Sequence, residues 1–233
     1  GPLSRTFLLQ YLPMDIAAPP TSPDDVIAFI DLGTNSLRLL LVRITPQHAY
    51  TVITQQKEMV RLGEGEFAAD TLQPPAIART VQVCRQFTEL AQRYRAREII
   101  AVATAATREA HNQAELLETL RAEAGLDLRV ISGMEEARLI YLGIASGVHL
   151  GERTAAFLDI GGGSTEIVIG DQRQYFDLES LKLGAIRLAA RVPTGDGPVS
   201  ADAYQAMQDE VRNTAVRAVQ RLRTYPVTLA FGC

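Results

Sequence analysis

The sequence predicts an α/β fold made of two related halves. From Val26 onward, short apolar runs typical of buried strands alternate with longer segments whose apolar residues recur at helical spacing. There is also an internal repeat: DLGTNSLRLLLV at 31–42 aligns without a gap on DIGGGSTEIVIG at 159–170, displaced by 128 residues. The alternation predicts sheets covered by helices, and the repeat predicts two successive halves whose matching loops face a shared cleft.

The first half is expected to begin with strands and to continue with helices. Three strands joined by short turns are predicted at 26–31, 37–44 and 49–60. A long helix is predicted at 74–95, because its apolar residues lie at helical spacing. The remaining elements of this half are a strand at 98–106, a helix that ends at Gly125, and a strand at 126–131.

The second half is also expected to combine strands and helices. It is expected to begin with a helix from about Gly133, followed by three strands at 154–160, 165–170 and 173–184. Two further helices and a last strand are predicted at 184–192, 201–225 and 226–231. We therefore expect a first domain at 24–132 and a second at 133–233. Residues 1–23 are rich in proline and show no period, so we expect a disordered leader or a cloning remnant.

Composition narrows the class of protein. The chain is 47% hydrophobic and 21% charged, as expected of a soluble globular protein with a core. A net charge of −4 argues against a general binder of nucleic acid or of membrane surfaces. No apolar stretch is long enough to span a membrane, and two cysteines give no disulfide framework. We expect a cytoplasmic protein.

The repeated segments predict two β-hairpins, each with an Asp at the end of its first strand. Backbone N–H groups in loops rich in glycine and serine suit phosphate oxygens. The candidate phosphate-binding residues are Gly33, Thr34, Asn35 and Ser36 in the first loop and Gly161, Gly162, Gly163 and Ser164 in the second. Asp31 and Asp159 would then hold a divalent cation that bridges phosphates. The alternative is that both Asp side chains only cap their own turns.

Four segments together resemble a known family. DLGTNS, VATAATREA, SGMEEARLIYLG and DIGGGSTE, in this order, resemble the exopolyphosphatase / guanosine pentaphosphate phosphohydrolase family. That family belongs to the superfamily of actin, Hsp70 and the sugar kinases, so the resemblance implies duplicated ribonuclease-H-like (actin-like) domains. It also implies hydrolysis of terminal phosphoanhydride bonds with Mg²⁺ or another divalent cation. The implied substrate is inorganic polyphosphate, cleaved processively, or guanosine pentaphosphate.

The resemblance also implies roles for single residues. Glu136 matches the proposed general base, and Arg108 matches an arginine that contacts phosphate. Glu166, with the loop Gly161 to Ser164, would bind phosphate and the metal-bound water, which makes Glu166 both a catalytic residue and a candidate metal ligand. Family members carry a further glycine-threonine loop after a strand such as VTLAFGC, so the second domain is expected to be incomplete. A homodimer is possible for a full-length protein.

The residues support some of these roles independently. Ser132 and Glu135 form a capping box at a helix start, whereas Glu136 has no such task. A carboxylate near phosphate is suited to act as a general base, and the alternative is a first-turn acid favoured by the helix dipole. Glu166 begins the apolar run IVI, so its burial requires a metal, a water or an arginine. The alternative for Glu166 is a salt bridge at the strand edge.

Two arginines and one glycine segment leave alternatives open. Arg38 stands at the position equivalent to Glu166 and could contribute positive charge to phosphate binding, or it could be a solvated strand residue. Arg108 lies at the carboxyl end of a strand, where it could bind phosphate or pair with Glu109 or Asp31. The segment RLGEGEF fails as a dinucleotide fingerprint, and a hairpin turn is predicted there.

Two other functions fit the same pattern. The first is an actin-like nucleotide-binding module that changes conformation with little hydrolysis. The second is a remnant that binds polyphosphate without cleaving it. Substitution of Glu136 by Gln separates the exopolyphosphatase from the first of these, because only a hydrolase depends on a general base.

Overall fold

The computed structural model describes residues 25–45, 49–195 and 197–233. The expected leader at 1–23 lies outside these residues. The described chain forms two compact units. The first unit extends to Glu66 and resumes with Asp70–Ile131, and the second comprises Phe67–Ala69 and Ser132–Cys233. Each unit is described by itself below.

The first unit is built on a five-stranded sheet in the order β3-β2-β1-β4-β5. Its strands are β1 (Asp25–Leu32), β2 (Leu37–Ile44), β3 (Tyr50–Glu58), β4 (Glu98–Ala103) and β5 (Leu128–Val130). The first three strands pair antiparallel, and β4 and β5 join β1 in parallel. All five are strands that the sequence predicts, because their apolar runs are bounded by turn residues.

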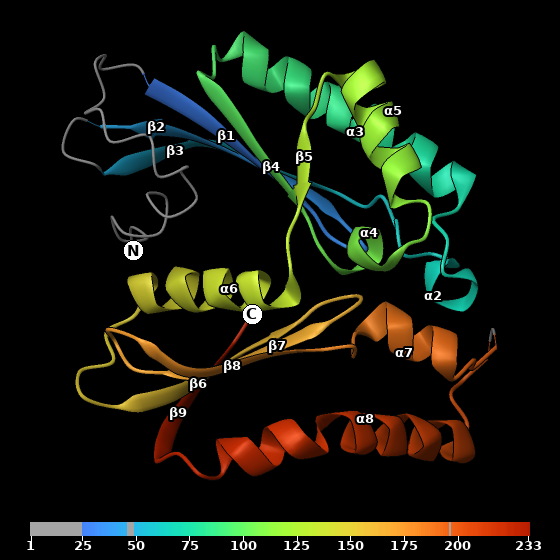
Figure 1. Cartoon of the computed structure of the whole chain (residues 1–233), viewed down its shortest axis with the longest axis vertical. Helices are drawn as coiled ribbons and strands as arrows, with labels where there is room; N and C mark the ends of the chain where they lie inside the picture. Colours follow the sequence, from blue (N-terminus) through green and yellow to red (C-terminus); the bar gives the residue numbers. More distant parts are fainter. Residues whose placement is uncertain (1–24, 46–48, 196) are drawn as a thin grey trace. The chain divides into compact units, whose positions relative to one another are not determined.

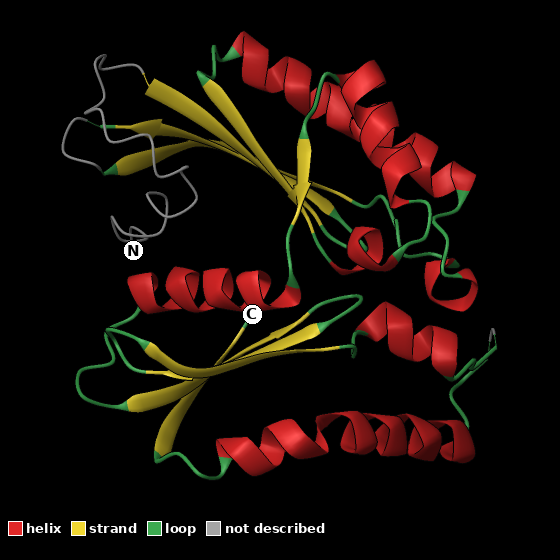
Figure 2. Ribbon diagram, in the orientation of Figure 1, coloured by secondary structure: helices red, strands yellow, loops and turns green. Residues whose placement is uncertain are grey.

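Two long helices cover one face of this sheet (Figures 1 and 2). They are α3 (Pro74–Arg93) and α5 (Gln113–Ala124). The apolar residues at helical spacing are buried on α3, among them Ile77, Val81 and Phe87, except Leu90, which is partly exposed. As predicted, α5 ends before Gly125, which adopts the left-handed conformation at φ 59°. Two short helices, α2 (Glu66–Ala69) and α4 (Ala105–Glu109), are not predicted by the periodicity, because neither completes two turns.

The second unit repeats the strand order of the first. Its four-stranded sheet has the order β8-β7-β6-β9. The strands are β6 (Thr154–Ile160), β7 (Thr165–Gly170), β8 (Tyr175–Leu181) and β9 (Val227–Gly232). As in β3-β2-β1-β4, three antiparallel strands are followed by one parallel strand. The predicted α/β class and the duplicated ribonuclease-H-like architecture are thereby confirmed.

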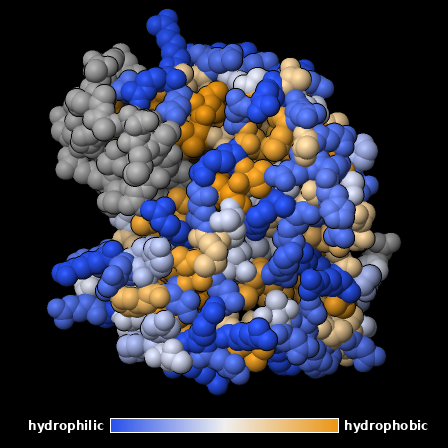
Figure 3. Space-filling model, in the orientation of Figure 1, coloured by the Kyte–Doolittle hydropathy of each residue, from blue (hydrophilic) through white to orange (hydrophobic). Residues whose placement is uncertain are grey.

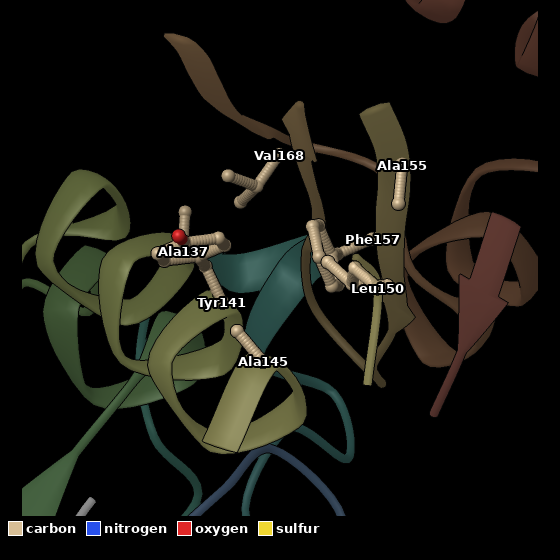
Figure 4. Close-up of a cluster of buried hydrophobic side chains, with 7 residues drawn as sticks. All are labelled: Ala137, Tyr141, Ala145, Leu150, Ala155, Phe157 and Val168. Atoms are coloured by element: carbon tan, nitrogen blue, oxygen red, sulfur yellow. The ribbon is translucent and has the colours of Figure 1, made fainter. Parts of the chain in front are cut away.

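Helices pack on both faces of the second sheet. Helix α6 (Gly133–Gly147) buries Ala137 and Tyr141 against Phe157 and Val168, and the Tyr141 and Phe157 rings meet edge to face at 5.2 Å (Figure 4). On the other face, Ala218 of helix α8 (Ala201–Leu222) packs with apolar residues of β7 and β8. Alternate residues of β7 therefore face different helices. A shorter helix, α7 (Ala185–Arg191), follows β8.

On the face seen in Figure 3, hydrophilic side chains dominate, with smaller hydrophobic areas among them. In the described residues, no helix combines the length and the apolar character needed to cross a membrane.

Candidate phosphate site

The two predicted hairpins have the same backbone geometry. The N–H of Gly33 donates to the carbonyl of Ser36, and the N–H of Gly161 donates to the carbonyl of Ser164, each over 3.0 Å. A Cβ atom added to Gly33 or to Gly161 would lie 3.2 Å from that same carbonyl oxygen. The repeat seen in the sequence is therefore a repeat of the loop's hydrogen bonding.

Strand register places the candidate acids opposite specific partners. In the first hairpin Asp31 pairs with Arg38, and in the second hairpin Asp159 pairs with Glu166. Directly opposed residues of antiparallel strands project on the same face, with Cβ atoms about 5 Å apart. The first hairpin thus pairs opposite charges, whereas the second places two carboxyl groups side by side.

In each sheet, the third strand adds one more residue to this row of directly opposed side chains. Arg38 pairs with Lys57 of β3, and Glu166 pairs with Ser180 of β8. The Ser180 hydroxyl donates to Oε1 of Glu166 over 2.7 Å. Glu166 is only 1% exposed, so the burial expected from the run IVI is observed. The Ser180 hydroxyl is one of the groups that compensate for burying this carboxyl group. Arg38, by contrast, is exposed.

The second loop is held by its carbonyl groups. The carbonyl of Gly161 accepts from the N–H of Ala185, and that of Gly162 accepts from the N–H groups of Ile186 and Arg187. The carbonyl of Gly163 accepts from Nε of Arg187 over 2.7 Å. The start of α7 therefore satisfies three consecutive carbonyl groups of the loop, and the loop in turn accepts from N–H groups that a helix start leaves without helical partners.

Peptide geometry then determines where the loop's donors point. In a planar trans peptide the N–H of one residue points opposite to the carbonyl of the residue before it. The N–H groups of Gly162, Gly163 and Ser164 consequently point away from α7. Three successive N–H groups that share a side form a concave donor set for an anion. Exposure falls along the loop, because Gly161 and Gly162 are partly exposed and Ser164 is buried.

The first loop is held in a similar way, by a segment whose role the sequence analysis missed. The N–H of Gly63 donates to the carbonyl of Thr34 over 2.8 Å, and the N–H of Arg61 donates to the carbonyl of Asn35 over 2.9 Å. The hairpin turn predicted for RLGEGEF is wrong: these residues form turns that lead into α2. They can reach the first loop because they follow β3, whose last residue, Glu58, pairs with Leu37 directly after that loop.

A sequence signal for this bracing exists. After the third strand of each sheet comes a basic residue, a leucine and a glycine: Arg61-Leu62-Gly63 in the first unit and Lys182-Leu183-Gly184 in the second. In the first unit Arg61 and Gly63 of the triplet donate to the loop of that unit, and in the second unit the residues directly after the triplet, 185–187, donate to the glycine loop. The second match could have extended the internal repeat beyond the two hairpins.

Glu136 lies in the first turn of α6. The predicted cap at this helix start is present, with the N–H of Glu135 donating to Oγ of Ser132 over 3.1 Å. Asp159 lies two positions after Phe157 on β6, and Glu166 lies two positions before Val168 on β7. Residues two apart on a strand share a face, so both acids lie on the face of the sheet that α6 covers.

The direction of α6 places its start near the glycine loop. Farther along the helix, Tyr141 donates to the carbonyl of Asp171, which follows β7. The carbonyl of Ala145 accepts from Gln172. The end of α6 is thus at the far end of β7, so its first turn, with half-buried Glu136, lies toward the end of the sheet that carries loop 161–164 (Figure 1).

Arg108 lies on α4 in the first unit, directly after β4 as the sequence predicts. Its NH1 group donates to the carbonyl of Ile131 over 3.0 Å. One side of the guanidinium is thereby oriented by the backbone, and this is compatible with a further role of the group in binding phosphate.

The second hairpin offers a donor set that suits Mg²⁺. Two opposed carboxyl groups repel each other unless a cation or a proton lies near them. Mg²⁺ is commonly held by one or two carboxylates, with water and phosphate as its other ligands. Within the described ranges there is no group of three or more His, Cys, Asp or Glu that could hold a metal. The pair Asp159 and Glu166 therefore fits Mg²⁺ better than a metal that needs a closed protein cage.

The predicted site residues are divided between the two units. The second unit contains Glu136, Asp159, Gly161 to Ser164 and Glu166 toward one end of its sheet. The first unit contains Asp31, the loop Gly33 to Ser36, Arg38 and Arg108. The roles of these residues stay predictions. The structure adds Ser180, Arg187 and Gly184, which the sequence analysis did not name as site residues.

Comparison with known proteins places this geometry in a family. The model of the Ppx/GppA phosphatase family matches residues 40–230. An exopolyphosphatase from Cytophaga hutchinsonii is 28% identical, with a TM-score of 0.86, and the match covers 90% of this chain and 66% of that one. The PPX-GPPA enzyme of Aquifex aeolicus is also 28% identical, with a TM-score of 0.70, over 89% of this chain and 67% of that one.

A more distant match concerns the fold alone. The PilM-PilN type IV pilus biogenesis complex matches with a TM-score of 0.52 and 16% identity, over 90% of this chain and 81% of that chain. This chain spans about two thirds of the length of the exopolyphosphatase and of the Aquifex enzyme.

Proposed function

Because this chain belongs to the Ppx/GppA phosphatase family, we propose that the protein hydrolyses terminal phosphoanhydride bonds and releases phosphate processively from inorganic polyphosphate. The observation that carries the proposal is the end of the second sheet. There, two opposed carboxyl groups lie beside a loop whose N–H groups point away from the helix that braces it. Donors and acids in this arrangement suit a phosphate chain and its cation.

Phosphate would be bound by backbone donors and by arginine. In the second loop the donors are the N–H groups of Gly162, Gly163 and Ser164, and the first loop offers those of Asn35 and Ser36. Arg38 and Arg108 would add positive charge, with Arg108 partly oriented by the carbonyl of Ile131. Phosphoryl transfer passes through a loose transition state, so positioning and charge neutralisation supply most of the catalysis.

Mg²⁺ would be held by Asp159 and Glu166, with Asp31 as a further predicted ligand. When bound, the cation would neutralise charge on the phosphate oxygens. The hydrogen bond from Ser180 restricts the orientation of the Glu166 carboxyl group. Glu166 would also orient the attacking water.

Glu136 would take the proton from the attacking water. Three observations support this role: its side chain is half-buried, it lies in the first turn of a capped helix, and α6 covers the face that carries Asp159 and Glu166. A general base of this kind contributes about 10²- to 10⁴-fold in rate.

Guanosine pentaphosphate is the alternative substrate, because its terminal phosphate presents the same phosphoanhydride chemistry. An actin-like nucleotide-binding module with little hydrolysis is the alternative from another class. The fold shared with the PilM-PilN complex is compatible with such a module, since the same architecture carries different sites.

A phosphate-release assay tests the proposal. Long-chain polyphosphate, guanosine pentaphosphate and ATP are compared in parallel, with Mg²⁺ and with EDTA. We expect Mg²⁺-dependent release that is fastest from polyphosphate. Preference for guanosine pentaphosphate would assign the alternative substrate, and preference for ATP would reject the proposal. Binding of polyphosphate without release would identify a binding remnant instead.

A further inference from the structure

Arg187 is a buried arginine that contacts the glycine loop of the second unit from behind. The residue is only 6% exposed, and its Nε donates to the carbonyl of Gly163 over 2.7 Å. The ring of Phe67, which belongs to the second unit by its contacts, has its centroid 4.1 Å from the guanidinium carbon. A buried guanidinium requires such hydrogen bonds and ring contacts, because removing it from water is costly.

The contact to Gly163 acts on the opposite side of the loop. The carbonyl of Gly163 and the N–H of Ser164 belong to one planar peptide and point in opposite directions. A bond that fixes the carbonyl therefore also fixes the direction of the Ser164 N–H. A charged donor at the carbonyl also polarises the peptide, which makes its N–H a stronger donor.

Gly184 lets the start of α7 approach the loop closely enough for this contact. A Cβ atom on Gly184 would lie 2.4 Å from the carbonyl oxygen of Gly162 and 2.5 Å from the nitrogen of Gly163. Both neighbours are backbone atoms, so no side-chain movement relieves the clash. A residue larger than glycine would push α7, and Arg187 with it, away from the loop.

The first loop has a brace that uses backbone groups at both matching carbonyls. The carbonyls of Thr34 and Asn35 accept from the N–H groups of Gly63 and Arg61. At the position that matches Asn35, the second loop has Gly163, whose carbonyl accepts from a charged side chain. The difference is specific to the loop that lies beside the carboxyl pair Asp159 and Glu166.

We infer that Arg187 is a positioning residue for phosphate binding: from behind the glycine loop, it orients and polarises the Gly163–Ser164 peptide so that its N–H meets a phosphate oxygen. The inference rests on the proposed function for its ligand. It does not need Arg187 to touch phosphate, because the guanidinium and the Ser164 N–H lie on opposite sides of the peptide.

Amide spectra of the full chain test this inference. The ¹H–¹⁵N resonances of Gly162, Gly163 and Ser164 are recorded during a titration with tripolyphosphate, for the wild type and for Arg187→Met. We expect the variant to shift or broaden these three resonances before ligand is added. We expect it to weaken tripolyphosphate binding by about 10- to 100-fold, the equivalent of one charge-assisted hydrogen bond.

Arg153→Met is the matched control. Nε of Arg153 also donates to a backbone carbonyl of the second unit, that of Leu150 over 2.9 Å, near the start of β6 and away from the loop. This variant should leave the loop resonances and the affinity unchanged. Arg187→Lys retains a charged donor and should recover part of the affinity. If Arg187→Met does not fold, the loop resonances and affinity of Arg187→Lys decide the question.

The possible outcomes separate the two proposals. Wild-type affinity and unchanged loop resonances in Arg187→Met would overturn the positioning role. If the wild type does not bind tripolyphosphate, the proposed function fails, and the loop resonances of the unliganded variant still show whether Arg187 orients the loop. Equal losses in Arg187→Met and Arg153→Met would also overturn the inference, because they indicate a general effect on the unit.

Discussion

The hairpins at 31–38 and 159–166 offer a comparison inside one chain. Their turns close with the same hydrogen bond, from Gly33 to Ser36 and from Gly161 to Ser164, each of 3.0 Å. The strands that flank the two loops end and begin at matching positions, Leu32 and Leu37 in the first unit and Ile160 and Thr165 in the second. Both loops have their carbonyls bound by the segment that follows the third strand. The loops 33–36 and 161–164 thus share their closing hydrogen bond and the way in which their carbonyls are held.

The side chains of the two hairpins differ in charge and in burial. Asp31 opposes an exposed Arg38, whereas Asp159 opposes a buried Glu166 that accepts from Ser180. Helix α6 covers the corresponding face in the second unit, while Phe29 and Leu40 in the first unit are only partly buried. The comparison teaches that a duplicated loop can retain one backbone geometry while its strands come to supply opposite charges.

The largest effect is expected at Glu136, which lies outside both hairpins. Glu136→Gln should reduce kcat by about 10²- to 10⁴-fold and leave substrate binding intact, because the amide cannot accept the proton from water. Phosphate release and polyphosphate binding are measured on the same preparations. Glu135→Gln is the control, because Glu135 is the residue next to Glu136 and belongs to the helix cap. This variant should change kcat by only a few-fold. Retained turnover in Glu136→Gln would reject Glu136 as the general base.

A matched pair of substitutions tests the opposite charges directly. Glu166→Gln should raise the Mg²⁺ concentration for half-maximal activity by about 10- to 100-fold, because it removes a carboxylate from the pair. Arg38→Gln should instead raise KM by about fivefold and reduce the dependence of KM on salt, as expected of an exposed charge.

Each substitution should affect its own measurement, the Mg²⁺ requirement for Glu166→Gln and KM for Arg38→Gln. Arg38→Gln is expected to leave the Mg²⁺ requirement unchanged, and Lys57→Gln, the next residue in its row, should have a smaller effect on KM than Arg38→Gln. An unchanged KM in Arg38→Gln would identify Arg38 as a solvated strand residue. An unchanged Mg²⁺ requirement in Glu166→Gln would remove Glu166 from the metal ligands.

The parts of this comparison that the sequence predicts are local in origin. The two hairpins, the helix start at Ser132 and the helix end at Gly125 each depend on residues a few positions apart, and family membership depends on several such short segments taken together. Such patterns are legible because capping and turn formation are local interactions. Burial of Glu166 is predicted by the apolar residues that follow it.

The parts that the sequence does not predict depend on register and on distant contacts. Ser180 meets Glu166 only because β8 pairs with β7 at that register. Arg187 meets Gly163 across 24 positions of chain, and α2 is too short to produce a helical period. These features are determined by packing, which single-sequence periodicity does not report.

Ser180→Ala tests whether the hydrogen bond from Ser180 to Glu166 stabilises the second unit more than an ordinary hydroxyl contact does. Removing the donor to a buried carboxyl group should cost about 1.5–3 kcal/mol of the opening free energy of the second unit. Native-state hydrogen exchange measures this, because it reports each unit separately. Ser146→Ala, which removes a hydroxyl bonded to the carbonyl of Gly143 in the same unit, should cost less than about 1 kcal/mol. Equal costs would contradict a special role for Ser180.

The smallest effect is expected for alanine substitutions of Gly33 and Gly161, which should lower the opening free energy of their own units by nearly the same amount. Gly33→Ala and Gly161→Ala each place a Cβ 3.2 Å from the loop's own serine carbonyl, a contact that is tight but can be relieved by a small shift. Each should therefore lower the opening free energy of its own unit by about 1 kcal/mol, and the two values should agree within about 0.5 kcal/mol, a typical surface-substitution difference. Gly197→Ala, where a Cβ meets no atom within 4 Å, should have almost no effect. A cost at Gly161 several times that at Gly33 would show that bracing by α7 makes the second loop stiffer than the first, so the shared hydrogen bond alone would no longer describe both.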